Sequence, residues 1–172
     1  DLSWALGGHR PEDFAAADVV VANPAVKPAH PLLRAARAAG AWITTEVELF
    51  LAAAPCRRVL ITGTQGKSST TRFCAQLLSA AGLRVHLGGN LGGSLLDELE
   101  RIGPDDVAAI EISSYQLEHL GQPPASARPA EAVALTSLLD DHLDRHGGRE
   151  GYAAAKRRLL ELVAPSGRAF LP

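Results

Sequence analysis

Short apolar runs alternate with segments of helical period along this chain. The runs are rich in valine, isoleucine and leucine and are bounded by glycine, proline or charged residues, a pattern typical of buried strands. They predict strands at residues 19–22, 41–44, 58–62, 85–87, 107–112 and 132–136. Apolar side chains spaced three or four positions apart predict helices at residues 31–39, 46–53, 67–81, 94–102 and 150–163. Strands that alternate with helices favour an α/β fold with a parallel sheet.

Two of the predicted helices have recognisable ends. The helix at residues 67–81 stops before Gly82, which suits the position after the last helical turn. Its apolar stripe consists of Phe73, Leu77, Leu78 and Ala81. Ser94-Leu95-Leu96-Asp97 reads as a capping box that starts the helix at residues 94–102.

Pro55-Cys56-Arg57 interrupts the pattern and marks a predicted domain boundary. We assign residues 1–56 to the end of a small Rossmann-like α/β domain. Residues 57–172 then form a P-loop-type central domain with a parallel sheet. The chain contains no methionine, and its last residues read as the start of a strand, so we expect a piece of a longer protein. Residues 121–129 are rich in proline and are predicted to be a surface loop.

A phosphate-binding loop is the strongest chemical signal. The strand at residues 58–62 runs into a glycine-rich turn, and Gly-Lys-Ser then opens the helix at residues 67–81. Glycines let backbone N–H groups converge on an anion, and the helix N-terminus adds partial positive charge. The predicted cradle consists of Gly63, Thr64, Gln65, Gly66, Lys67, Ser68 and Ser69. The alternative is a turn that only joins a strand to a helix.

Glu111 is a candidate metal ligand at the end of the strand at residues 107–112. The carboxyl ends of parallel strands form the edge where α/β sheets bind ligands, and a carboxylate there can hold nucleotide-bound Mg²⁺. The alternative is a charge that faces solvent, but apolar neighbours on both sides argue against it, because a buried unpaired carboxylate is costly.

Other polar segments are weak signals by themselves. His142 follows the strand at residues 132–136, and as a neutral imidazole it is a candidate ligand for a second metal, although a solvated loop is the commoner reading. Gly88 to Gly93 reads alone as a turn. Lys156 stands beside two arginines, a pattern that usually marks a solvated helix face, and an ammonium has no lone pair for a metal.

Composition narrows the range of functions. The chain has 172 residues, 17 basic and 19 acidic, so its net charge is −2 and no basic excess suggests nucleic acid. No apolar run approaches the roughly 18 residues that a membrane span needs, and the start of the chain is not a signal peptide. Cys56 and Cys74 lack metal or disulfide spacing. We therefore expect a cytoplasmic, monomeric protein with reduced cysteines that binds neither nucleic acid nor membrane.

Together these segments resemble the Mur ligases, the ATP-dependent amino-acid ligases of peptidoglycan precursor synthesis. The short loop at residues 63–68 is similar to that family's form of the P-loop. Three further segments are similar to the member that joins D-glutamate to UDP-N-acetylmuramoyl-L-alanine: Glu48-Leu49-Phe50, residues 88–92 and residues 111–118. Two more segments then follow in the order found in the family: residues 141–145 and Tyr152-Ala153-Ala154-Ala155-Lys156.

The resemblance implies roles for individual residues. Lys67 and the loop at residues 63–69 would bind ATP phosphates, and Lys67, His142 and Lys156 would serve catalysis. Metal ligands would be Ser68 and Glu111 for one Mg²⁺, with His142 and a carbamylated Lys156 supporting a second. The residues along the substrate cleft would be Asn90, Ser113, Gln116 and His142.

The implied reaction has two steps. The substrate carboxylate attacks the γ-phosphate of ATP to give an acyl phosphate, and the D-glutamate amine then displaces phosphate. Departures from the family pattern are Ala25, Gln65, Ser69, Ser137 and Leu139. The resemblance also implies contacts for the uracil and for D-glutamate outside residues 1–172, so we expect these residues alone to be inactive. The alternatives are another amide ligase of the superfamily, such as a different Mur ligase or folylpolyglutamate synthetase, and a non-catalytic nucleotide-binding module.

Overall fold

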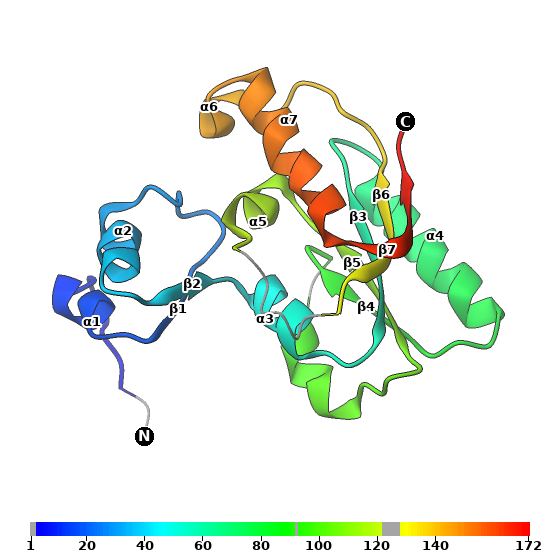
Figure 1. The fold of residues 1–172 in the computed structure, drawn as a ribbon, viewed down its shortest axis with the longest axis horizontal. Coiled ribbons are helices and arrows are strands. Elements are labelled where there is room, and N and C mark those ends of the chain that lie inside the picture. The colour runs from blue at the N-terminus through cyan, green and yellow to red at the C-terminus, as the bar shows by residue number, and fades with distance from the viewer. Residues whose placement is uncertain (1–2, 92, 122–127) are drawn as a thin grey trace.

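Two separate parallel sheets organise the chain in the computed structural model, which describes residues 3–91, 93–121 and 128–172 (Figure 1). The smaller sheet pairs β1 (Val19–Val21) with β2 (Trp42–Thr44). The helices of this part are α1 (Pro11–Ala15) and α2 (Pro31–Ala38). Its core consists of Ala22, Leu33, Ala36, Ala41 and Ile43. Three of these five residues are alanines, so this core buries less apolar area than the core of the larger sheet.

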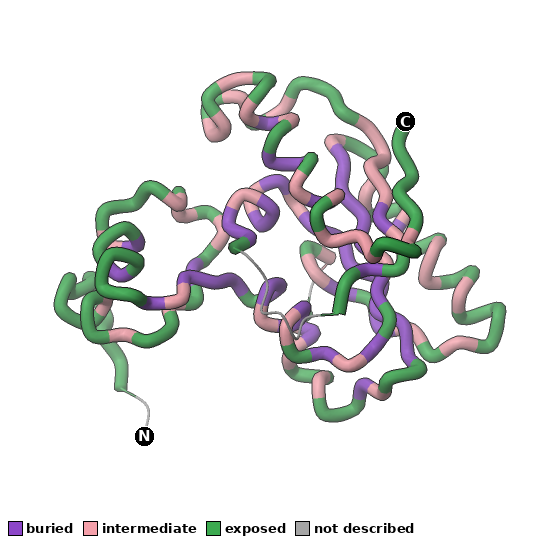
Figure 2. Tube along the Cα trace, in the orientation of Figure 1, coloured by how far each residue is buried: buried purple, intermediate pink, exposed green. Residues whose placement is uncertain are grey.

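The larger sheet has five parallel strands in the order β4-β5-β3-β6-β7. The strands are β3 (Arg57–Thr62), β4 (Val85–Gly89), β5 (Val107–Glu111), β6 (Ala130–Leu135) and β7 (Val163–Phe170). Every residue of β5 is buried, and Figure 2 shows purple along the centre of this sheet. Because β3 lies between β5 and β6, the loops after these three strands meet at one edge of the sheet.

Helices cover this sheet from several parts of the chain. They are α3 (Glu46–Ala53), α4 (Lys67–Ala80), α5 (Ser114–His119), α6 (Leu143–His146) and α7 (Arg149–Arg157), together with the 3₁₀ helices η1 (Leu95–Arg101) and η2 (Arg158–Leu162). Val47, Phe50 and Leu51 of α3 belong to the same core cluster as Leu60 and Ile110 of the larger sheet. By packing, α3 therefore belongs with the larger sheet, and the predicted boundary at residues 56–57 stays a prediction.

The predicted fold class is confirmed, and the six strands with predicted bounds lie within about two residues of their predicted positions. The seventh strand, β7, was expected only as a strand beginning near residue 167, but it starts at Val163. The short helices α1, α5 and α6 were not predicted. The apolar period is too short to detect in helices of four to six residues. A capping box starts α5, because the Ser113 hydroxyl accepts from the Gln116 N–H while the Gln116 side chain accepts from the Ser113 N–H.

Three predictions about helices were wrong. The segment at residues 94–102 forms the 3₁₀ helix η1, and the predicted helix at residues 150–163 ends as α7 and continues as η2. Apolar spacing fits both kinds of helix, so it does not distinguish them. The third error concerns α4, where Phe73 and Leu77 are 65% and 72% exposed. The buried residue of α4 is Thr71 instead of a member of the apolar stripe.

Other predictions have simple outcomes. Gly82 has φ +86° directly after the cap of α4, as predicted. Cys56 and Cys74 are free thiols, and burial raises the pKa of both. Residues 122–127 of the predicted surface loop lie outside the described residues. Within the described ranges, no helix combines the length and apolar character needed to cross a bilayer.

Candidate active site

The glycine-rich loop after β3 has the geometry of an anion cradle. Gly66 caps α4 with φ +80°, and Gly63 has φ +153°, values that side chains disfavour. A Cβ at Gly63 would also overlap the Thr136 hydroxyl. Because α4 has 14 residues, its N-terminus adds a substantial positive dipole end to the loop.

The end of β6 supports this loop from the side. The Thr136 hydroxyl donates to the Gln65 carbonyl at 2.5 Å, and the Gln65 N–H donates to the Ser137 hydroxyl at 2.9 Å. Lys67 Nζ donates to the Thr64 carbonyl at 2.9 Å, so the ammonium lies over the cradle. Thr136 was not predicted as part of the site, because its contact with the loop depends on the neighbouring position of β6 in the sheet.

Glu111 is buried at the end of β5 with both oxygens engaged. It is 1% exposed, so the reading as a solvent-facing charge is wrong. Ser68 Oγ donates to one carboxylate oxygen at 2.7 Å, and Asn90 Nδ2 donates to the other at 2.9 Å. A serine hydroxyl beside a carboxylate is a set of hard oxygen donors, which fits Mg²⁺. The structure thus brings Ser68 and Glu111 together, as the sequence predicted.

Lys156 is also buried, at 3% exposure, so the reading as a solvated helix face is wrong. Its Nζ donates to the Gly63 carbonyl at 2.7 Å and lies 4.7 Å from the centre of the Tyr152 ring. Burial first, and then the charge of Lys67, lower the pKa of Lys156 from 10.5 to about 8. A fraction of the amine is therefore neutral near physiological pH.

His142 lies at the N-terminus of α6 in a left-handed conformation, with φ 49°. Among the described residues it is the only non-glycine with positive φ, which is an energetically costly conformation often found at functional sites. The Tyr115 hydroxyl lies 3.5 Å from His142 Nδ1, and an Asp141 carboxylate oxygen lies 3.5 Å from Nε2. Both ring nitrogens of His142 therefore face polar partners.

Lys67, His142 and Lys156 line the smaller of two adjoining cavities. The smaller, of about 250 Å³, is lined by Gly63, Lys67, Asn90, Ser113, Ser114, Tyr115, Asp141, His142, Tyr152 and Lys156. The larger, of about 570 Å³, is lined by Val21, Ala22, Asn23, Pro24, Thr45, Glu46, Val47, Gly89, Asn90, Ser113, Tyr115 and Gln116. Asn90, Ser113 and Tyr115 line both cavities, so the two spaces meet there.

Not every predicted residue joins the cavities. The predicted site residues that line neither cavity are Thr64, Gln65, Gly66, Ser68, Ser69 and Glu111. Of these, Gln65 and Ser69 are exposed, on the cradle loop and the first turn of α4. Ser113 and Gln116 also form the cap of α5, so their side chains have a structural role in addition to facing the larger cavity. In the described part of the chain, no three His, Cys, Asp or Glu side chains form a group able to hold a metal, so both Mg²⁺ sites stay predictions.

Two tyrosines were missed as site residues. Tyr115 lines both cavities, and Tyr152 is 1% exposed with its hydroxyl 3.0 Å from Thr64 Oγ1. Both residues fall inside sequence segments that carry the family resemblance, and that position was the only available signal. Their roles depend on which loops pack against them, which the segments do not reveal.

A glycine-rich loop between a central strand and a helix, with a buried carboxylate ending the next strand, defines a P-loop-type α/β protein. The Mur ligase middle domain matches residues 61–172. The chain therefore belongs to the Mur ligase family.

Curated relatives share sequence over most of this chain. The UDP-N-acetylmuramoylalanine–D-glutamate ligase of Trichlorobacter lovleyi is 41% identical over 94% of this chain and 35% of its own length. The enzyme of the same name from Geobacter metallireducens is 42% identical over 93% of this chain and 34% of its own length. The chain thus spans about a third of the length of these relatives.

Solved structures share the fold. The MurF ligase of Thermotoga maritima in complex with ADP has a TM-score of 0.56 at 17% identity, covering 92% of this chain and 46% of that one. A UDP-N-acetylmuramoyl-L-alanyl-D-glutamate–2,6-diaminopimelate ligase has a TM-score of 0.57 at 22% identity, covering 89% and 42%. At these identities the likeness is one of fold alone.

Proposed function

We propose that this chain is the ATP-binding, carboxylate-activating part of a ligase that joins D-glutamate to UDP-N-acetylmuramoyl-L-alanine. One observation carries the proposal: Lys67, His142 and Lys156 line a cavity that opens into a larger cleft along Asn90 and Ser113. A phosphate site beside a cleft of this size suits the transfer of phosphate to a bound acceptor. The names of the relatives at 41% and 42% identity support the choice of substrates.

The cradle would hold the phosphates of ATP. Its backbone N–H groups and the N-terminus of α4 bind the anion, and the Lys67 ammonium neutralises charge as the acceptor carboxylate approaches. Ser68 and Glu111 would hold Mg²⁺, which offsets phosphate charge when it is bound.

The proposed reaction balances in two steps. A carboxylate oxygen of the acceptor bonds to the γ-phosphorus, and ADP leaves. The amine nitrogen of D-glutamate then bonds to the acyl carbon, phosphate leaves and the nitrogen loses a proton. The first step is needed because a free carboxylate has no adequate leaving group, whereas an acyl phosphate has one. The residues facing the acceptor in the cleft would be Asn90, Ser113, Gln116 and His142.

Lys156 has the properties of an amine that reacts with CO₂. With a pKa of about 8, roughly a tenth of the amine is neutral and nucleophilic at pH 7. Its nitrogen would bond to the carbon of CO₂ with loss of a proton, which replaces a buried cation with an anion. Nuclear magnetic resonance in labelled bicarbonate should then show one carbamate signal in the unaltered chain and none in Lys156→Met.

The decisive experiment is a ligation assay on the longest natural chain that contains residues 1–172. We expect phosphate release from ATP that depends on UDP-N-acetylmuramoyl-L-alanine and on D-glutamate. L-lysine, L-alanine and diaminopimelate should not replace D-glutamate, and activity with one of them would indicate a different ligase of the superfamily. Lys67→Ala should abolish turnover, while Lys27→Ala, an exposed lysine outside both cavities, should not.

The alternative that the sequence left open is a nucleotide-binding module without catalysis. We further propose that residues 1–172 alone bind nucleotide but do not ligate. Turnover of ATP with D-glutamate by these residues would contradict that. Unchanged turnover in Lys67→Ala would support the module.

A further inference from the structure

Arg145 in α6 connects the two parts of the chain. Its side chain is 8% exposed, although it carries a permanent charge. Nε donates to the Glu118 carboxylate at 2.8 Å, and the terminal nitrogens reach three consecutive carbonyls of the segment that follows β1. The three acceptors are Ala25 at 2.6 Å, Pro24 at 3.0 Å and Val26 at 3.1 Å.

This arrangement uses the particular chemistry of arginine. A planar guanidinium offers five N–H donors in a fixed fork, so one side chain can hold several carbonyls in one geometry. Glu118 supplies the opposite charge, which offsets the cost of burying the cation. His119 Nε2 also lies 2.6 Å from the Val26 carbonyl, so α5 and α6 both hold residues 24–26.

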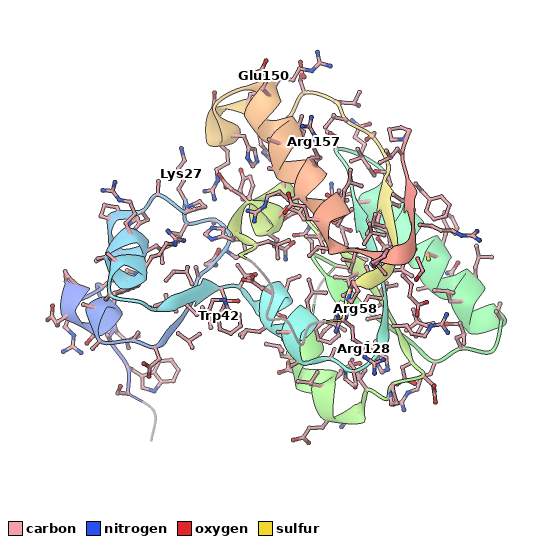
Figure 3. All side chains as sticks on the ribbon, viewed as in Figure 1. Lys27, Trp42, Arg58, Arg128, Glu150 and Arg157 are labelled. Atoms are coloured by element: carbon pink, nitrogen blue, oxygen red, sulfur yellow. The ribbon has the colours of Figure 1, made fainter. Side chains whose placement is uncertain are left out.

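The held segment forms a wall of the larger cavity. Asn23 and Pro24 line that cavity opposite Tyr115 and Gln116 of α5. In Figure 1 the connection between β1 and α2 approaches α5, and Figure 3 labels Lys27 on this connection. Arg145 and His119 are thus the side chains that tie this wall to α5 and α6.

Arg145 is also linked to the smaller cavity. Its guanidinium carbon lies 4.6 Å from the centre of the Tyr115 ring, and that ring lies 5.1 Å from the His142 ring. A shift of Arg145 would therefore move both the wall at residues 23–26 and the tyrosine that lines the two cavities.

We propose that Arg145 is a positioning residue that fixes the width of the larger cleft, so that a bound nucleotide-sugar carboxylate faces the phosphate site. This proposal rests on the proposed function for the identity of the substrate. The expected effect is on binding of the acceptor and on its alignment with ATP, because a misplacement of about 1 Å can cost up to about 100-fold in rate. Binding of ATP itself, which depends on the cradle after β3, should not change.

Hydrogen exchange tests the structural half without any ligand. The Ala25 N–H donates to Asn23 Oδ1 at 2.9 Å, and the Val26 N–H donates to the Asn23 carbonyl at 3.0 Å, so exchange of either amide requires its hydrogen bond to open. In Arg145→Ala we expect their exchange to become about tenfold faster or more, because the segment opens locally. Arg149→Ala is the matched control, since Arg149, the first residue of α7, makes an exposed ion pair with Asp140.

Kinetics test the functional half, in the longest natural chain that contains these residues. Arg145→Ala should raise the KM for UDP-N-acetylmuramoyl-L-alanine about tenfold or more and leave the KM for ATP unchanged. Arg145→Lys should restore part of the loss, because an ammonium reaches fewer of the three carbonyls. If Arg145→Ala does not fold, Arg145→Lys and Glu118→Gln take its place, with smaller effects of the same kind.

Two results would overturn the proposal. One is a folded Arg145→Ala with the exchange and KM of the unaltered protein. The other is an equal rise in both KM values, which would indicate general damage. If the unaltered protein does not ligate at all, the proposed function fails, and the exchange of Ala25 and Val26 still decides whether Arg145 holds the segment.

Discussion

Lys156 should make the folded chain less stable than a neutral residue would at the same place. Its pKa falls from 10.5 to about 8, chiefly through burial. Each pH unit between these values corresponds to about 1.4 kcal/mol, so the protonated side chain costs the fold about 3 kcal/mol below pH 8. Methionine is similar in length and uncharged, so Lys156→Met removes this cost. It also removes the bond to the Gly63 carbonyl, worth about 1 kcal/mol.

We therefore expect Lys156→Met to raise the free energy of unfolding by about 2 kcal/mol at pH 7. The sign of the pH dependence follows from the lowered pKa. Between about pH 8 and pH 10.5 the folded state has lost the proton while the unfolded state keeps it, so the unaltered chain gains stability as pH rises. The advantage of the methionine variant should disappear above this range.

Urea denaturation followed by far-ultraviolet circular dichroism measures this difference, in buffers free of bicarbonate so that the amine stays unmodified. Arg157→Met is the matched control, because Arg157 is the exposed neighbour of Lys156 on α7 (Figure 3). The reasoning is refuted if Lys156→Met is less stable at pH 7, or if its advantage does not change with pH.

Three further predictions concern the cradle, the carboxylate and a distant ion pair. Gly63→Ala should destabilise the chain by about 1–3 kcal/mol and weaken nucleotide binding, because Gly63 has a positive φ and an added Cβ would overlap the Thr136 hydroxyl. The control is Gly8→Ala, whose Cβ would meet nothing within 4 Å, and it should leave the free energy of unfolding unchanged in the same urea titration. Glu111→Gln should weaken Mg²⁺-dependent ATP binding in calorimetry by tenfold or more, with less effect when Mg²⁺ is omitted, because the charge that faces the metal is lost; equal losses in both conditions would contradict the metal role. Hydrogen bonds from the Gly103 N–H, and then from His86, hold the pKa of Asp106 below its usual range. Asp106→Asn should therefore lower the free energy of unfolding near pH 7, and the difference from the unaltered chain should vanish as pH falls below about 4. A difference in stability that persists in acid would contradict this prediction.

Local order along the chain was sufficient to predict the cradle and its partner carboxylate. A strand, a glycine turn, Lys67-Ser68 and a helix are contiguous, and this order allows few other geometries. Glu111 was predictable because it ends an apolar strand, and parallel strands end at the same edge. The α/β class and most strand positions followed from apolar runs in the same way.

Apolar periodicity did not predict which side chains are buried, because burial depends on the segments that pack against each helix. The residues of the predicted stripe on α4 are apolar, yet Phe73 and Leu77 are exposed and Thr71 is buried, because apolar spacing does not show which face of a helix packs against the sheet. Lys156 looked like a surface residue, since its neighbours are arginines, and its burial depends on α7 packing against the end of β3. Only the family resemblance pointed to it.

The sequence by itself therefore determined the features that neighbouring residues encode: the cradle loop, the position of Glu111 at the end of a strand, and the parallel sheet. Tertiary structure alone decided which distant groups meet. Arg145 reaches carbonyls about 120 positions away, and Lys156 reaches Gly63 across 93 positions. No local pattern encodes such a pair, because the donor and the acceptor meet only when distant segments of the chain have folded against each other.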